Sequence, residues 1–207
     1  MPEDRSTLGQ GNPPRRTPKA QASISSLRDH FLLAMPSIET GIFSGSITYI
    51  CEHGEAGAMG IVLNQPLDLC LDEIFEHLEI DTHSSFEEEP VLAGGPVQID
   101  HGFVLHPPHR KEWDATLRVT KDIHLTTSQD VLKAIASGDG PQEFVIALGY
   151  AGWSAGQLEE EIAGNSWLTL PAERHILFQT SVAQRVSAAA AMLGIDMNLL
   201  STEAGHA

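Results

Sequence analysis

The chain has 207 residues, 42% of them apolar and 19% charged, which is the composition of a globular domain and not of a disordered chain. No apolar run approaches the roughly 18 residues that span a bilayer, and the first twenty residues lack the apolar core of a signal peptide. We therefore expect a cytoplasmic protein without a membrane segment. The two cysteines, Cys51 and Cys70, lie in apolar surroundings and are expected to be reduced and buried.

Charge is distributed unevenly along the chain. Residues 1–22 hold four basic and two acidic residues, whereas the rest holds 8 basic and 26 acidic residues, a net charge of −18. Binding to nucleic acid requires clustered Lys and Arg against the phosphates, so we expect no direct nucleic-acid binding by the acidic part. We interpret residues 1–22 as a disordered basic extension and residues 23–207 as a single domain.

The first half of the domain is predicted to consist mainly of strands. Short apolar or alternating runs predict strands at residues 30–35, 46–51 and 58–63, and the loop of a hairpin at residues 52–57. Apolar residues then recur at i, i+3, i+4 and i+7 over residues 71–78, which predicts a short amphipathic helix.

The second half mixes strands with single helices. Strands are predicted at residues 91–92, 102–106, 117–126, 144–148, 167–170 and 176–178, and helices at residues 129–136, 155–163 and 181–193. The order lacks the regular alternation of a doubly wound fold. Roughly nine strands and four helices predict an α+β fold with a curved, mostly antiparallel sheet, compatible with closure into a small barrel, and helices on the outside.

The segment Gly152-Trp153-Ser154-Ala155-Gly156 spells G-x-S-x-G between a predicted strand and a predicted helix, as in the nucleophile elbow of serine hydrolases. The chain order Ser154, Asp196, His206 is also the serine, acid, histidine order that such hydrolases use. The parallel βα units that would hold the acid and the base are missing, however. Ser154 and Gln157 also fit a capping box, in which the Ser154 hydroxyl accepts from the Gln157 amide and the Gln157 side chain reaches back. We therefore interpret the segment as a structural turn.

Anion and metal sites are opposed by simpler interpretations. The glycine-rich turn leaves backbone amides free for an anion, but the acidic residues 159–161 would repel a phosphate. His101, His106 and His109 lie close in sequence, yet the intervening prolines direct the last two apart. We predict neither a metal site nor a cofactor.

Six segments match a known family in the same order: FLLAMP (31–36), CEHGEAGAMGIVLNQP (51–66), GGPVQIDHGFVLH (94–106), LTTSQDVLKAI (125–135), GYAGWSAGQLEEEI with NSWL after it (149–168), and the terminal GHA. From about residue 25 onward the chain thus resembles the YqgE/AlgH family of bacterial proteins. The resemblance implies a cytosolic α+β domain whose bifurcated sheet includes a small closed barrel, surrounded by helices. It implies no enzyme activity, and members are often labelled as transcriptional regulators. Many members have glycine at the position of Ser154, which a required nucleophile would not tolerate.

Three functional hypotheses follow. The leading one is a non-enzymatic binding or regulatory protein that acts through a protein partner. Its binding surface gathers residues at strand ends and turns: Glu52, His53, Asn64, Gly95, His106, Tyr150, Trp153 and Gln157. An alternative that stays open is that Asn64, Trp153 and Trp167 only tie turns together. The second hypothesis is a serine hydrolase that uses Ser154. The third is a thiol-based sensor, in which the imidazolium of His53 lowers the pKa of the Cys51 thiol.

Overall fold

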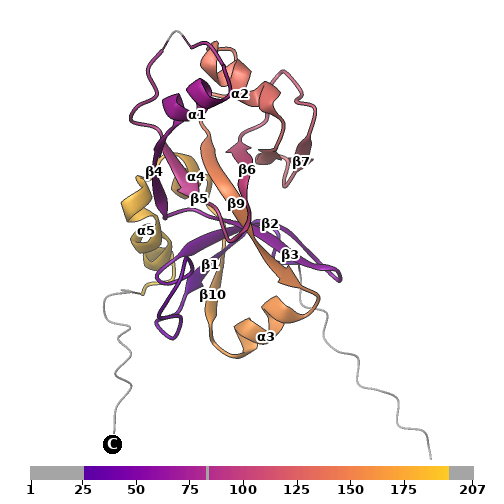
Figure 1. Cartoon of the computed structure of the whole chain (residues 1–207). Helices are drawn as coiled ribbons and strands as arrows, with labels where there is room; N and C mark the ends of the chain where they lie inside the picture. Colours follow the sequence, from indigo (N-terminus) through magenta and orange to yellow (C-terminus); the bar gives the residue numbers. More distant parts are fainter. Residues whose placement is uncertain (1–25, 83, 196–207) are drawn as a thin grey trace, which may run out of the picture.

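The structure is a computed structural model that describes residues 26–82 and 84–195 (Figure 1). The predicted disordered extension, residues 1–22, lies outside the described residues. Within them the chain forms ten strands, five α-helices and one 3₁₀ turn. The strands are β1 (His30–Ala34), β2 (Ile47–Gly54), β3 (Gly57–Val62), β4 (Pro66–Cys70), β5 (Pro90–Ala93), β6 (Val97–His106), β7 (Thr116–Arg118), β8 (His124–Thr126), β9 (Val145–Ser154) and β10 (Trp167–Pro171). The helices are α1 (Leu71–His77), α2 (Gln129–Ala136), α3 (Gln157–Ala163), α4 (Arg174–Phe178) and α5 (Arg185–Met192), with the 3₁₀ turn η1 (Val182–Gln184) before α5.

Strand β9 organises the sheet. The strand order is β10-β1-β2-β3-β9-β6-β8-β7, and β4 and β5 branch off beside β9. The first half of β9 pairs antiparallel with β6 and parallel with β5, whereas its second half pairs antiparallel with β3. Figure 1 shows β9 running through the molecule from the α1 and α2 end to the α3 end. The predicted α+β fold with a curved, bifurcated sheet is confirmed, and the sheet is an open half-barrel, since β10 and β7 end the strand order of the described residues.

Glycines allow β9 to cross the β5–β6 connection at very short distance. A Cβ atom at Gly95 would lie 2.0 Å from the carbonyl carbon of Tyr150, and one at Gly149, where φ is 74°, would lie 2.5 Å from the Gly95 oxygen. Only glycine fits such an approach of two backbones. The predicted strand 144–148 therefore continues to Ser154, and most of the predicted glycine-rich turn is strand.

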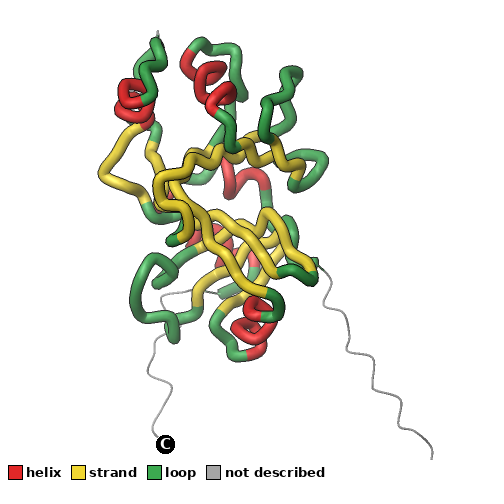
Figure 2. Tube along the Cα trace, turned by 45° about the vertical axis from the view of Figure 1, so that its right-hand side comes forward, coloured by secondary structure: helices red, strands yellow, loops and turns green. Residues whose placement is uncertain are grey.

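Three apolar clusters hold the fold together. The largest fills the inside of the curled sheet and is covered by α4 and α5 through Ile176, Leu177 and Ala189. A second lies between the sheet and the helices α1 and α2, and a third lies between the sheet and α3. Figure 2 shows helices at both ends of the sheet, which matches the separation of the last two clusters. Each helix is thus attached by one buried face, as expected for amphipathic helices.

Several predicted elements require correction. Residues 176–178, predicted as a strand, belong to helix α4, because the amides of Ile176 and Leu177 donate to the Glu173 carbonyl. Three apolar residues are too few to distinguish a strand from a buried helical turn. The run 117–126 is a hairpin of β7 and β8, and the predicted helix 181–193 starts as the turn η1. Strand β4 was not predicted, since its Pro66 and Asp68 are poor strand formers and it pairs only with β5.

Candidate functional site

Ser154 ends strand β9 and is tied to Gln157. The Ser154 amide and hydroxyl both donate to Oε1 of Gln157, each at 3.0 Å. The Gln157 side chain therefore reaches back as predicted. The helix begins at Gln157 with Gly156 as N-cap, at φ 78°, so the predicted role of the Ser154 hydroxyl as acceptor for the helix is wrong. The proposed triad partners Asp196 and His206 lie outside the described residues.

The acidic helix α3 is fixed to the sheet by two of its glutamates. The Glu161 carboxylate accepts the indole N–H groups of Trp153 at 2.9 Å and of Trp167 at 2.7 Å. The Glu159 carboxylate accepts from Nε2 of His53 at 3.0 Å, while Nδ1 of His53 accepts the Leu27 amide. From the sequence, these glutamates were expected only to repel a phosphate at the start of the helix. A Trp eight residues before a Glu gives no local signal for this contact.

Trp153 is a core residue. Its side chain is only 6% exposed and packs at 6.1 Å from the Trp167 ring and 6.2 Å from the Phe43 ring. Tyr150 is half-buried on the opposite face of β9, where its ring packs edge-on against Phe103 at 5.6 Å. Since neighbouring strand residues alternate between faces, one of the two aromatic residues lies under α3 and the other does not.

Cys51 is fully buried and does not pair with His53. The register of β2 against β3 shifts between Ile50 and Glu52, which makes Cys51 the extra residue of a β-bulge. Cys51 therefore packs with Tyr49 in the core of the curled sheet, whereas His53 points to α3. Burial raises the pKa of the Cys51 thiol. Both observations weigh against a reactive thiolate.

An open depression, here called the hairpin groove, lies beside the β2–β3 hairpin. Its volume is about 700 Å³. The lining residues are Arg28, Glu52, His53, Gly54, Glu55, Ala56, Gly57, Ala58, Met59, Val97, Tyr150, Gly152 and Trp153. Four of the eight predicted surface residues, Glu52, His53, Tyr150 and Trp153, thus line the groove, but the Trp153 side chain is buried, so its prediction as a surface residue is wrong. A fifth, Gln157, does not line the groove; its side chain accepts from the Ser154 amide and donates to Glu161.

The rim of the hairpin groove is acidic. Glu52 and Glu55 are exposed, and the one Lys or Arg among the lining residues is Arg28. The Arg28 guanidinium lies 3.8 Å from the Glu52 carboxylate and also donates to the Cys51 carbonyl. Because this charge is already matched, the groove offers a negative surface over a floor that contains glycine backbone.

The remaining three predicted surface residues are structural. Asn64 accepts the Ile47 amide and donates to the Gly45 carbonyl, which ties the end of β3 to a turn. Gly95 is buried at the crossing with β9. His106 is 1% exposed, so its prediction as a surface residue is wrong, as is that of Gly95. The sequence could not reveal this, because a histidine before two prolines is typical of an exposed loop.

His106 belongs to a buried chain of hydrogen bonds. Its Nδ1 lies 2.7 Å from the Pro107 carbonyl, so this nitrogen carries the proton, and Nε2 lies 2.8 Å from the Thr126 hydroxyl. Thr126 in turn bonds to the Thr116 hydroxyl at 2.8 Å. Burial lowers the pKa of His106 below its usual value, which keeps the ring neutral.

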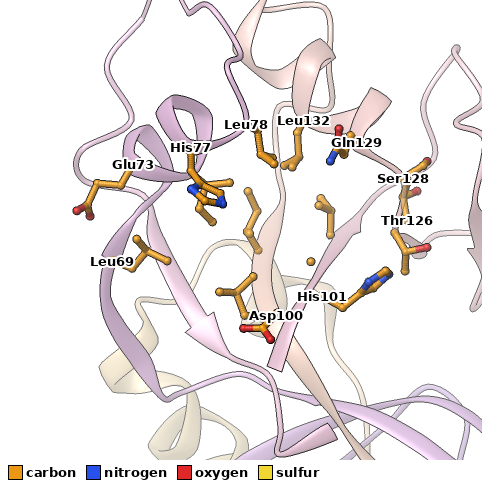
Figure 3. A pocket seen from close by; sticks show the side chains of 16 residues that line it. Leu69, Glu73, His77, Leu78, Asp100, His101, Thr126, Ser128, Gln129 and Leu132 are labelled. Carbon is orange, nitrogen blue, oxygen red and sulfur yellow. The ribbon is translucent and has the colours of Figure 1, made fainter. Parts of the chain in front are cut away.

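A second cavity, here called the helix cleft, lies between helices α1 and α2 and the strands β6 and β9 (Figure 3). Its volume is about 520 Å³. The lining residues are Leu69, Glu73, Ile74, His77, Leu78, Asp100, His101, Gly102, Val104, Thr126, Thr127, Ser128, Gln129, Leu132, Ile146 and Leu148. Of these, His101 was considered in the sequence as a possible metal ligand.

Neither a metal-binding cluster nor a membrane-spanning helix occurs among the described residues. No three His, Cys, Asp or Glu side chains among residues 26–82 and 84–195 come together in a way that would hold a metal ion. His101 and His109 illustrate the reason, since the first is exposed on β6 and the second stacks on Trp113 at 5.5 Å. None of the described helices is both long and apolar enough to cross a membrane.

Comparison with known proteins identifies the family. A family model described as AlgH-like matches residues 31–198. A UPF0301 protein from Saccharophagus degradans is 53% identical over 190 residues, which cover 92% of this chain and 93% of the relative. A UPF0301 protein from Thioalkalivibrio sulfidiphilus is 52% identical over 183 residues, which cover 88% and 98% of the two chains.

Solved structures agree with this result. The solution structure of the AlgH protein from Pseudomonas aeruginosa has a TM-score of 0.73 at 48% identity, with 90% of this chain and 99% of that chain covered. A protein from Corynebacterium diphtheriae has a TM-score of 0.68 at 19% identity, with 88% and 94% covered, and shares the fold. The chain belongs to the AlgH-like family.

Proposed function

We propose that the chain is a non-enzymatic binding protein that recognises a protein partner through the hairpin groove. One observation carries this proposal. Four parts of the chain that are far apart in sequence, Arg28, residues 52–59, Val97 and the end of β9, line a single open depression. Surfaces of this kind, with polar and aromatic groups held at strand ends by a rigid sheet, are typical binding sites.

The chemistry of the groove favours a basic partner with an apolar side chain. Glu52 and Glu55 supply negative charge at the rim, while Met59, Val97 and Tyr150 supply partly buried apolar surface. Complementary charge steers such partners and contributes to their specificity. A regulatory role would then act through this partner in the cytoplasm, because an acidic domain of charge −18 repels the phosphates of DNA.

The enzymatic alternatives receive less support. The Ser154 hydroxyl bonds to a glutamine, and among the described residues no histidine bonds to it. A serine nucleophile requires a base at hydrogen-bond distance. The Cys51 thiol lies under the sheet and has no exposed surface.

Site-specific photocrosslinking in the native bacterium tests the proposal. A photoreactive amino acid at Glu55, in the groove, is expected to give one discrete covalent adduct with another protein. The same group at Lys121, whose side chain is 90% exposed in the β7–β8 turn, serves as the control and is expected not to give that adduct. The change Tyr150→Ala in the Glu55 version should strongly reduce the adduct. Identical adducts from both positions, or none from Glu55, would contradict the proposal.

A further inference from the structure

We infer that the helix cleft is a binding site for a small amphipathic cation, an apolar chain or ring that carries an ammonium group. The cleft is separate from the hairpin groove, and no residue lines both. Its volume of about 520 Å³ lies within the range of about 300–1,000 Å³ that is typical of sites for small organic ligands.

The apolar part of the ligand is specified by side chains that the protein itself leaves partly uncovered. Helix α1 buries Leu71 and Phe75 against the sheet, but Ile74 and Leu78 on its neighbouring face are only half-buried and line the cleft. Figure 3 shows Leu78 and Leu132 pointing into the cavity from the helices above it. An apolar ligand would complete this packing, since burial of apolar surface is favourable.

The sign of the ligand charge follows from the lining residues. No Lys or Arg among residues 26–82 and 84–195 lines the cleft, and the chain as a whole has a net charge of −16. The Asp100 carboxylate lies at the lower edge of the cavity in Figure 3, and no donor or cation within the described residues pairs with it. Glu73 at the other edge is partly committed, because its carboxylate accepts the Cys70 amide at 2.8 Å. An anionic head group would therefore be repelled and a cationic one attracted.

The N-terminal end of α2 does not change this conclusion. Helix N-termini attract anions, and Ser128 and Gln129 at the start of α2 line the cleft. The carboxylate of Asp130 already occupies this position, where it accepts the Val131 amide and the Ser128 hydroxyl. The positive end of the helix dipole is thus neutralised within the protein.

A strained bulge places Asp100 at the cleft. Val97 pairs with Tyr150 and Gly102 pairs with Leu148, so residues 98–101 of β6 lie opposite Gly149 alone. Gln98 in this bulge has a φ of 50°, which is unfavourable for a residue with a side chain, and Ile99 is 62% exposed. Bulges redirect side chains and are common next to functional sites. Here the bulge brings Asp100 to the cavity, while the exposed Ile99 does not line it.

Titration of the ¹⁵N-labelled full chain with three probes of equal chain length tests the inference. The probes are octylammonium, octanol and octanoate at constant ionic strength, observed through amide shifts. We expect saturable shifts at Gly102, Leu132 and Leu148, with the tightest binding for octylammonium and the weakest for octanoate. Asp100→Asn should weaken octylammonium about fivefold, the effect of one partly exposed ion pair, and leave octanol unchanged. Asp122→Asn, a change of equal charge at an exposed position in the β7–β8 turn, should have no effect.

Two further variants fill the cleft. Ile74→Trp is expected to abolish the shifts for all three probes, and His77→Trp, at an exposed position of the same helix, provides the same test should Ile74→Trp fail to fold. The inference is overturned if octanoate binds as tightly as octylammonium, if Asp100→Asn and Asp122→Asn behave alike, or if the saturable shifts lie outside the cleft.

Discussion

The hairpin groove and the helix cleft differ in how they arise. The groove is open and acidic, and it is built from turn and strand-end residues, half of the predicted surface set among them. The cleft is a smaller apolar cavity that forms because two short helices do not fully cover the sheet. Strand β9 serves both, with Ile146 and Leu148 in the cleft and Tyr150 and Gly152 in the groove. Polar residues on turns can be recognised in the sequence, whereas a cavity between packed elements cannot.

The largest effect is expected at the crossing that separates the two cavities. In Gly149→Ala the new Cβ would lie 2.5 Å from the Gly95 oxygen at a φ of 74°. We expect a loss of more than about 4 kcal/mol in the free energy of unfolding, measured by urea denaturation, or no soluble protein. Gly102→Ala is the control, because no atom of the described residues beyond its two chain neighbours lies within 4 Å of the added Cβ, and it should change stability by less than about 1 kcal/mol. Equal effects of the two changes would show that the crossing is not tight.

A second prediction concerns hydrogen bonds that support the hairpin groove and not the helix cleft. Glu161→Ala removes the acceptor of two buried indole N–H groups, those of Trp153 and Trp167. We expect destabilisation by about 2–4 kcal/mol, since each buried donor left unpaired costs about 1–3 kcal/mol. Amide shifts should change in the groove, which Trp153 lines, and not in the cleft. Glu160→Ala on the exposed side of the same helix should cost less than about 0.5 kcal/mol. Comparable losses in the two variants would refute the role of Glu161.

Acidification tests the buried His106, whose partner Thr126 lines the helix cleft. Burial lowers the pKa of His106 below the value of about 6.5 that it has in the unfolded chain. The unfolded state then binds more protons at low pH. His106 therefore causes no loss of stability above about pH 6.5, and the free energy of unfolding decreases as the pH falls through and below this value. Burial also lowers the pKa of the more exposed His124, which should contribute less.

Urea unfolding between pH 8 and pH 5 measures this dependence. His106→Gln, which does not titrate, should flatten it more than His124→Gln does. An unchanged pH dependence in His106→Gln would mean that His106 is accessible to protons in the folded protein.

The smallest effect is expected at Asp29, the residue that follows Arg28 of the hairpin groove. Asp29 has a φ of 63° and accepts the Tyr49 hydroxyl at 2.9 Å, and burial raises the pKa of its carboxyl. The ionised form is therefore disfavoured in the folded protein. Asp29→Asn should stabilise slightly at pH 7, because asparagine tolerates positive φ and still accepts from Tyr49. This gain should vanish below about pH 3.9, where Asp29 is protonated in both states.

Thermal unfolding at pH 7 and pH 3 checks whether Asp29→Asn stabilises the protein at the first pH and not at the second. The same change at Asp139, whose side chain is 75% exposed, is the control and should leave stability unchanged at both values. Destabilisation by Asp29→Asn at pH 7 would indicate that the charge of Asp29 is needed in the fold.

The sequence predicted most strands and helices, because apolar periodicity reflects which side of an element is buried. It failed where the signal is short or absent. Residues 176–178 have strand-forming side chains but sit in a helical turn under the sheet, and β4 contains a proline and an aspartate. The sequence also gave no sign of the bulge in β2, which separates Cys51 from the His53 imidazole that was expected to lower its pKa.

The amino-acid sequence alone determined the acidic charge, the α+β class, the family and the residue types of the hairpin groove. Only the tertiary structure decided that Trp153 is buried on Glu161, that His106 is internal, and that a cleft lies between α1, α2 and the sheet. The physical reason is that composition and periodicity describe each element by itself. A cavity or a buried hydrogen bond depends on side chains that meet from distant parts of the chain, as Leu78, Asp100 and Leu132 do around the helix cleft.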